Sequence, residues 1–443
     1  MPLRKRYQDF ADYIRYAKNK SFYPYFHTIS QSSGPEVEID GRKLVMVSSN
    51  DYLGLAHDPE VVKKSADALR LWGTGPGGSR FLCGNLRLHE ILEERLAAFV
   101  GKKYALVHAT GFCTNFGSIG SLVNADDFIL YDRENHASIF EGCRASGARI
   151  VPFGHNNVAA ARRKIDHLTK NHDSPGILLI TEGVFSMSGE MAPLDELVEL
   201  KKRYPGLFIY LDDAHGLGVM GGGQGSAHHF GVTSEIDFIM GTFSKAFGSV
   251  GGFISSDHED IITYLKHHSK TLIFSAALPA ANVATVLASL DVLENNPGRL
   301  KRLHKIADRV REGYKAIGLR FRNSETPIIS VHIGSEEKAS RFSLDLFENG
   351  VFALPVVYPA VPKGQEGIRT AFMSTHEDHH IDFVLEVLDR LARKHRIRIS
   401  DLESKDDCSL AVNMPLEPAR AMAQLPQSAK FAPDIQEHSG KNP

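Results

Sequence analysis

The chain has 443 residues, of which 42% are hydrophobic and 23% charged, which is the composition of a globular protein with a substantial core. Its 51 lysines and arginines nearly balance its 53 aspartates and glutamates, so a net charge of -2 gives no general attraction to nucleic acid or to an anionic membrane. The four cysteines (Cys83, Cys113, Cys143, Cys408) are scattered and form no CxxC pair, which argues against a zinc site and a disulfide framework, so we expect a cytoplasmic protein. No run of residues approaches the ~18 apolar residues of a membrane span, and peripheral membrane contact stays open.

The first half of the chain alternates between patterns of helices and strands. From about Val61 to Ala98 the pattern predicts a helix, a glycine-rich break and a second helix. Apolar runs of strand length follow, several of them separated by enough residues for a helix: "YALVHA", "FILYD", "ARIVPF", "GILLITEGVF", "LFIYLDDAHG" and "DFIMGTFSK". This order predicts an α/β fold with a mostly parallel sheet, covered on both faces, between about Lys43 and Ser275.

The second half predicts a smaller α/β region. Long amphipathic helices and the short strands "PIISVHIG" and "GIRTAFMS" lie between about Ala280 and Arg398. We therefore expect an N-terminal segment over 1–45, a large domain over 46–279 and a small C-terminal domain over 280–400. The tail over 401–443 has little periodicity and is predicted to be flexible.

The segment "GTGPGG" at 73–78 formally matches the dinucleotide fingerprint GxGxxG. That fingerprint needs a strand before it and a helix directly after it, whereas a helical pattern precedes this segment and a loop pattern follows. We interpret it as a tight loop that lets a ligand approach the backbone, with a purely structural turn as the alternative.

Ionisable residues follow several of the predicted strands. Asp212, Asp213 and His215 of "YLDDAHGLG" come directly at the end of one strand, and His136 of "ENHASI" follows another. Ligands of open α/β sheets bind at the carboxyl edge, which favours a functional role. A metal site is a weaker interpretation because no second cluster supplies further ligands, and a lone histidine such as His136 is commonly just a hydrogen-bonded residue.

Two further segments suit an anion and a nucleophile. "ATGFCTN" at 109–115 follows a strand and opens a helix, so its amides and hydroxyls suit a phosphate. In "GTFSKAFGSVGG" at 241–252, Thr242 and Ser244 could hold an anion, and Lys245 lies among small residues. A partly desolvated lysine has a lowered pKa and attacks carbonyl groups, whereas an exposed loop lysine is the alternative. Together these segments meet the requirements of pyridoxal phosphate chemistry.

The ordered series of motifs resembles the α-oxoamine synthases, which are fold type I pyridoxal phosphate enzymes. The resemblance runs from about Phe22 to Arg398 and rests on "SSNDYLGL", "GGSRFLCGN", "HEILEERLAAFVGK", "TGF", "NHASI", "EGVFSMSGE", "DDAHGLGV", "GTFSKAFGSVGGF" and "IRTAFMSTH". It implies an aspartate aminotransferase-like fold, in which a large, mostly parallel sheet domain carries a smaller C-terminal α/β domain.

The resemblance also assigns roles to individual residues. It implies that Lys245 forms the internal aldimine with pyridoxal phosphate, Asp212 pairs with the pyridinium nitrogen and His215 contacts the ring hydroxyl. The remaining cofactor contacts that it implies are His136 stacked on the ring, Gly111 and Phe112 beside the phosphate, and Ser186 and Thr242. Arg369, assisted by Asn50, is expected to grip the amino-acid carboxylate, because a planar guanidinium suits that task.

The implied reaction is a decarboxylative condensation of an amino acid with an acyl thioester of CoA or an acyl carrier protein, which gives a 2-amino ketone, carbon dioxide and a free thiol. The opening segment, "FGHNN" and "LPVVYPAVPKGQEGIRTAFMSTH" look most like the bacterial members that join L-serine to palmitoyl-CoA and form 3-ketosphinganine for sphingolipids. Pro76, Gly77 and Tyr358 depart from that pattern, since some of those members carry arginine where Tyr358 stands.

Other members stay open as alternatives: those that use alanine with a pimeloyl thioester, glycine with acetyl-CoA, or substrates of a secondary pathway. A non-catalytic partner subunit is a further alternative, against which the presence of Lys245, Asp212 and Arg369 argues. The resemblance finally implies a homodimer with shared active sites, in which Thr271 or Ser275 reaches the neighbour's phosphate.

Overall fold

The computed structural model describes residues 3–173, 175–322 and 324–403. Residues 1–399 form one compact unit, and the chain from Ser400 onward belongs to a second unit. From residue 404 the predicted flexible tail lies outside the described residues, and the predicted domain boundaries stay predictions. Among the described residues no helix has the length and apolar content that crossing a bilayer requires.

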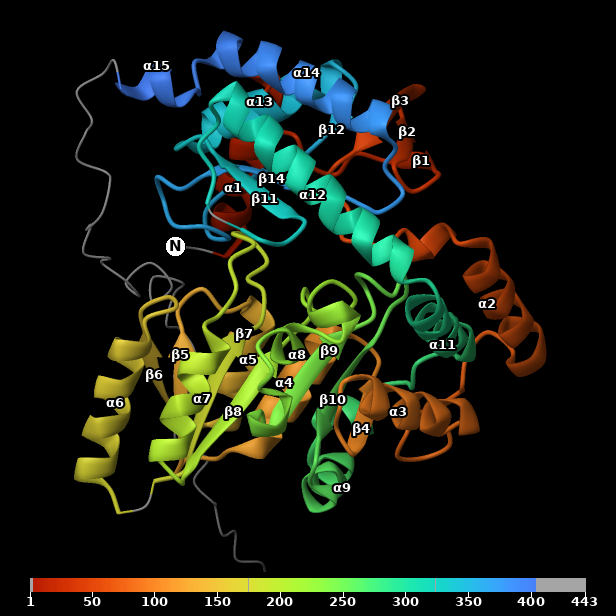
Figure 1. The fold of residues 1–443 in the computed structure, drawn as a ribbon, viewed down its shortest axis with the longest axis vertical. Helices are drawn as coiled ribbons and strands as arrows, with labels where there is room; N and C mark the ends of the chain where they lie inside the picture. The colour runs from red at the N-terminus through yellow and green to blue at the C-terminus, as the bar shows by residue number, and fades with distance from the viewer. Residues whose placement is uncertain (1–2, 174, 323, 404–443) are drawn as a thin grey trace, which may run out of the picture. The chain divides into compact units, whose positions relative to one another are not determined.

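A seven-stranded sheet forms the centre of the larger lobe (Figure 1). Its strands, in spatial order, are β4 (Tyr104–His108), β10 (Gly252–Ser256), β9 (Phe238–Thr242), β8 (Leu207–Asp212), β7 (Ile177–Glu182), β5 (Phe128–Asp132) and β6 (Arg149–Phe153). β10 is antiparallel to both neighbours, and the other strands run in one direction, which confirms a mostly parallel sheet. The sequence patterns missed β10.

Helices cover both faces of this sheet because its strands are apolar on both sides. In β7, Ile177 and Leu179 pack on one face with α6 and α7, while Leu178 and Ile180 pack on the other with α4, α5 and α9. These helices span Val158–Asn171 (α6), Leu194–Arg203 (α7), Gly111–Leu122 (α4), Ala137–Ser146 (α5) and Glu259–His268 (α9); α8 (Ser226–His229) and α10 (Lys270–Ile273) are short. Continuous apolar runs therefore marked the central strands correctly.

The glycine-rich break lies between two helices, as predicted. α2 (Pro59–Trp72) is capped by Asp58, whose side chain accepts hydrogen bonds from the amides of Glu60 and Val61. α3 (Arg87–Phe99) begins only after a loop. α11 (Ala280–Asn295) packs against α2 and α3. The glycine motif at 73–78 thus has a helix on its amino side and further loop up to residue 86 on its carboxyl side, which agrees with the rejection of a dinucleotide fingerprint.

Two small sheets complete the compact unit. A four-stranded sheet joins β1 (Ile29–Ser32), β2 (Glu36–Ile39) and β3 (Arg42–Met46) to β12 (Val351–Phe352), so the expectation that the large sheet starts near Lys43 is wrong. A three-stranded sheet holds β11 (Ile328–His332), β14 (Gly367–Ala371) and β13 (Pro355–Val356). α12 (Pro297–Ile317), α13 (Glu336–Glu348) and α14 (Asp378–His395) share one apolar core with these strands (Figure 1), while α1 spans Leu3–Asn19 and α15 Ile399–Glu403.

Candidate active site

The predicted cofactor residues converge on one edge of the seven-stranded sheet. Because β4, β5, β7, β8 and β9 run in the same direction, their carboxyl ends meet at that edge. Each of these strands brings at least one predicted residue there: Gly111 and Phe112 after β4, His136 after β5, Ser186 after β7, Asp212 and His215 at β8, and Thr242 and Lys245 at β9. Asn50 and Arg369 come from outside this sheet and join the site through hydrogen bonds.

Lys245 lies in a turn where the backbone packs closely against its neighbours. Gly248 has a φ of +60°, and a Cβ there would lie 2.5 Å from the amide nitrogen of Ala56. These contacts explain why small residues surround the lysine. Burial lowers the pKa of Lys245, although the charges of Asp212 and Glu182 partly oppose the shift. The ε-amine is therefore more readily available as a neutral nucleophile than an exposed lysine.

Asp212 is buried and held by donors that the sequence patterns did not single out. Its Oδ2 accepts a hydrogen bond of 2.7 Å from Nδ2 of Asn115, and its Oδ1 accepts one of 3.0 Å from the amide of Ala214. The Oδ1 of Asn115 in turn accepts a hydrogen bond of 2.9 Å from the hydroxyl of Tyr210, and its Nδ2 donates one of 2.9 Å to Oγ of Ser138. These bonds fix the orientation of the carboxylate at the carboxyl end of β8.

His136 caps the amino end of α5. Its Nδ1 accepts a hydrogen bond of 3.2 Å from the amide of Ser138 and lies 2.8 Å from the hydroxyl of the same residue. Since that hydroxyl accepts from Asn115, its own proton points to Nδ1. Burial lowers the pKa of His136, so its neutral form carries the remaining proton on Nε2 and can donate it.

Arg369 in β14 links the predicted substrate residues to His215. Its Nη2 donates a hydrogen bond of 2.8 Å to Oδ1 of Asn50 and lies 3.4 Å from the hydroxyl of Tyr52, while its Nε donates 2.6 Å to the carbonyl of Ser186. The Tyr52 hydroxyl is 2.6 Å from Nδ1 of His215. Burial, with the neighbouring cations of the site, lowers the pKa of His215 well below its usual value. Tyr52 was missed, although it lies inside the motif "SSNDYLGL".

The amino end of α4 packs closely against the hydroxyl groups at the end of β9. A Cβ on Gly111 would lie only 2.7 Å from Oγ1 of Thr242, and that oxygen also bonds the carbonyl of Gly251 and lies 3.0 Å from Oγ of Ser244. Phe112 follows Gly111 and is half exposed. The first amides of a helix lack partners within the helix, so this site fits a phosphate group.

Two further buried carboxylates lie nearby: Glu182, which the sequence patterns did not single out, and Asp213, which they placed beside Asp212 at the end of its strand. Glu182 lies beside Asp212 across β7 and β8, and its Oε1 accepts 2.5 Å from the amide of His136. Burial and the charge of Asp212 raise the pKa of Glu182 well above its usual range. Asp213 accepts 2.6 Å from both the amide and the hydroxyl of Ser226, so it orders the turn after β8. Cys83, Cys113 and Cys143 are free thiols, while Cys408 lies outside the described residues.

The fold and this constellation define a fold type I pyridoxal phosphate enzyme. The chain matches the profile of the family described as aminotransferase class I and II over residues 42–388. It is 41% identical over 371 residues to the serine palmitoyltransferase of Bacteriovorax stolpii, which covers 84% of this chain and 87% of the relative. It is 38% identical over 381 residues to the 8-amino-7-oxononanoate synthase of Thermoanaerobacter pseudethanolicus, and that match covers 86% of this chain and 95% of the relative.

Among solved structures, a variant of the serine palmitoyltransferase from S. paucimobilis with a bound PLP–myriocin aldimine has a TM-score of 0.86 and 30% identity, and the match covers 90% of this chain and 100% of that one. The chain therefore belongs to the aminotransferase class I and II family and, within it, to the α-oxoamine synthases, which are pyridoxal phosphate-dependent acyltransferases. The family, the fold class and the cofactor predicted from the sequence are confirmed.

Proposed function

We propose that this enzyme condenses L-serine with a long-chain acyl-CoA such as palmitoyl-CoA, forming 3-ketosphinganine, carbon dioxide and free CoA. The observation that carries the reaction class is the convergence of Lys245 and Asp212, at the carboxyl edge of the large sheet, with Arg369 of β14. Relatives that are serine palmitoyltransferases at 41% and 39% identity support the substrate pair.

The residues at the sheet edge fit the cofactor and its chemistry. Lys245 would hold pyridoxal phosphate covalently, Asp212 would keep the ring nitrogen protonated, and Gly111 with Thr242 would border the phosphate. When bound, pyridoxal phosphate supplies an electron sink that acidifies the α-carbon of an amino acid. Lys245 then acts as the base at that carbon, for which its lowered pKa suits it.

The amino-acid carboxylate is expected to bind Arg369. That guanidinium is fixed by Asn50 and the carbonyl of Ser186, so it enters the reaction already oriented. The Nε2 proton of His136 provides a second donor for the same carboxylate. Holding this group until carbon–carbon bond formation would delay its loss as carbon dioxide.

A second candidate is the condensation of L-alanine with a pimeloyl thioester. It is favoured by relatives at 38% identity that are 8-amino-7-oxononanoate synthases and by Tyr358, which stands where some serine-using members carry arginine. Tyr358 is partly exposed, and Nζ of Lys363 lies 5.5 Å from its ring centroid, so this position presents an aromatic face with one nearby cation. The acyl carrier, CoA or a carrier protein, stays open in both cases.

We further propose a homodimer with shared active sites. Large apolar side chains are exposed in and beside the glycine-rich loop and after α10: Leu71 (78%), Leu82 (79%) and Phe274 (84%). The two segments lie together, since the amide of Ala277 donates 2.9 Å to the carbonyl of Gly78. The hydroxyl of Thr271 donates 2.7 Å to the carbonyl of Cys113 in its own chain, which favours Ser275 as the residue that reaches a neighbour's phosphate.

The decisive test replaces the proposed nucleophile. Lys245→Ala is expected to abolish both turnover and the visible absorbance of the lysine-bound cofactor, whereas the matched control Lys266→Ala, at an exposed lysine of α9, retains both. Product analysis with L-serine, L-alanine and glycine against palmitoyl-CoA, pimeloyl-CoA and acetyl-CoA then identifies the pair. Full turnover in Lys245→Ala would refute the mechanism, and product from alanine and pimeloyl-CoA alone would replace the serine assignment. The cytoplasmic location stays a prediction from the cysteine pattern.

A further inference from the structure

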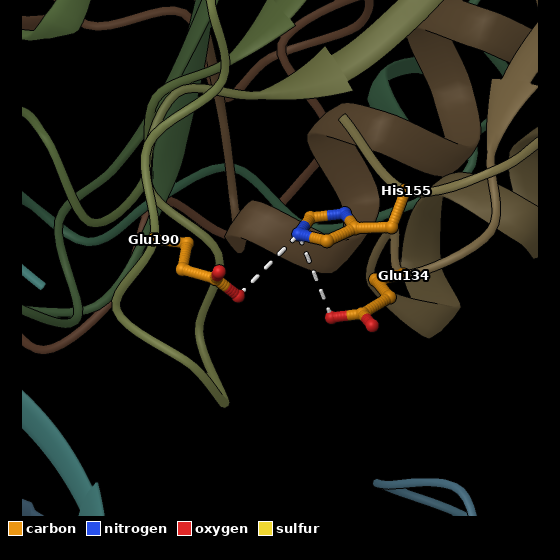
Figure 2. Close-up of side chains that lie close together, drawn as sticks. All are labelled: Glu134, His155 and Glu190. Carbon is orange, nitrogen blue, oxygen red and sulfur yellow. Dashed lines mark ion pairs between the residues drawn. The ribbon is translucent and has the colours of Figure 1, made fainter. Parts of the chain in front are cut away.

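A compact charged cluster lies next to the active site and has no role in the chemistry described above. Figure 2 shows its three central side chains, in which the carboxylates of Glu134 and Glu190 approach the same nitrogen of His155. Nε2 of His155 is 3.7 Å from Glu134 and 3.6 Å from Glu190, while its Nδ1 is 3.1 Å from Oδ1 of Asp132. Glu134 follows β5, His155 follows β6, and Glu190 belongs to the loop after β7.

This geometry resembles a metal site, but a cation already occupies it. Nη1 of Arg322 is 2.6 Å from Glu190 and 3.3 Å from Glu134, so the guanidinium takes the position at which both carboxylates converge. Burial opposes protonation of His155, yet its hydrogen bond to Asp132 and the nearby carboxylates of Glu190 and Glu134 raise the pKa of His155 to about 10. With His155 protonated, the cluster is an ion network of three carboxylates and two cations, in which the ring offers no lone pair to a metal and Arg322 lies between the two glutamates.

Arg322 comes from a different part of the chain from the carboxylates. It follows Phe321, which bridges to Val331 of β11, and its Nη2 donates 2.6 Å to the side-chain oxygen of Gln365. Gln365 lies four residues before Arg369 in sequence, directly ahead of β14. One guanidinium thus joins the segment that leads to Arg369 with two loops at the edge of the large sheet.

Those two loops carry other residues of the site. Glu134 lies two residues before His136, and Glu190 lies four residues after Ser186, whose carbonyl accepts from Arg369. Neutral contacts hold the second loop as well: the carbonyl of Gly189 accepts from Ser324 at 2.9 Å and from Thr326 at 3.2 Å. These contacts do not involve Arg322, so the loop keeps anchors when the guanidinium is removed.

We propose that Arg322 is a positioning residue that sets Arg369 and His136 relative to one another, and thereby determines the affinity for the amino-acid carboxylate. The inference rests on the proposed function, because it concerns the carboxylate that Arg369 would bind. Without Arg322, Glu134 and Glu190 keep one cation between them, but the link from both glutamates to Gln365 and the segment before β14 is lost. A shift of about 1 Å in a bound group can cost on the order of a hundredfold in rate, so even a small displacement is measurable.

The test measures amino-acid binding to the holoenzyme by the change in cofactor absorbance, with L-serine, L-alanine and glycine as probes. Arg322→Met is expected to raise the dissociation constant of the responding amino acid by about tenfold or more, with little change in KM for the acyl thioester. Arg322→Lys keeps one ion pair but cannot span both glutamates and Gln365, so it should recover only part of the affinity. The matched control is Arg320→Met, at an exposed residue of the same segment.

The outcomes separate this inference from the proposed function. A wild-type holoenzyme whose spectrum responds to none of the three amino acids would refute the proposed function. A wild-type response with an unchanged dissociation constant in Arg322→Met would overturn the role of Arg322, as would an equal loss of affinity for amino acid, acyl thioester and cofactor. If Arg322→Met does not fold, Arg322→Lys decides, since wild-type affinity in that variant excludes the bridging role. A wild-type affinity that depends on added Zn²⁺ or Mn²⁺ would also overturn it.

Discussion

Gly111 offers the sharpest test of the phosphate-binding site, because the structure gives the cost of a single added methyl group. In Gly111→Ala the new Cβ would lie 2.7 Å from Oγ1 and 3.0 Å from Cβ of Thr242, which is about 0.7 Å inside ordinary van der Waals contact for the closer atom. Gly111 is not among the glycines with positive φ, so the expected cost arises from this contact rather than from the backbone. Thr242 is buried and cannot turn away without losing its bonds to Gly251 and Ser244.

The expected cost follows from these contacts. Overpacking of this kind destabilises a protein by about 1–3 kcal/mol, and relief by a shift of α4 would move its first amides away from the phosphate. We expect Gly111→Ala to lower the urea midpoint of unfolding and to weaken pyridoxal phosphate binding by about tenfold. Thr242→Ala removes the closest atom, so Gly111→Ala should cost less in that background than in the wild type.

A matched substitution in the same helix separates this effect from a change in helix propensity. A Cβ on Gly120 would lie 3.4 Å from Cβ of Ala145, which is ordinary contact, so Gly120→Ala is expected to be neutral or slightly stabilising. Equilibrium titration of the apoprotein with pyridoxal phosphate and urea unfolding provide the two readings. Wild-type stability and affinity in Gly111→Ala, or an equal loss in Gly120→Ala, would refute the reasoning.

Two further predictions concern Arg369 and His155. Arg369→Lys keeps the charge but cannot bond Asn50 and the carbonyl of Ser186 together, so KM for the amino acid should rise by about tenfold or more in steady-state assays, and an unchanged KM would contradict its role. Burial disfavours protonation of His155, yet its hydrogen bond to Asp132 and two further carboxylates nearby raise its pKa to about 10. Protonated His155 therefore stabilises the fold fully below pH 6.5, and this contribution is lost as the pH rises to about 10. His155→Gln should flatten the pH dependence of the free energy of unfolding across that range by on the order of 3 kcal/mol, measured by urea titration, and a slope equal to the wild type's would count against this assignment.

The strand ends and the residues on them could be predicted because both depend on local sequence. A strand buried on both faces is a continuous apolar run, and the residue after it lies at the carboxyl edge of a parallel sheet wherever the strand is placed. Lys245, Asp212 and His136 were therefore placed correctly without knowledge of the neighbouring strands. The position of the glycine-rich loop after a helix was predicted for the same reason, since the helical pattern before it is local.

Only the tertiary structure determined the contacts between segments that lie far apart in sequence. β3 pairs with β12, some 300 residues away, and β10 enters the large sheet between β4 and β9, although neither pairing leaves a trace in the local pattern. Asn115 lies 97 residues from the carboxylate that it orients. Both the strand pairings and the bond to Asp212 form because buried polar groups need hydrogen-bond partners once the layers pack. For a buried carboxylate, only the folded chain can bring a donor from a distant segment.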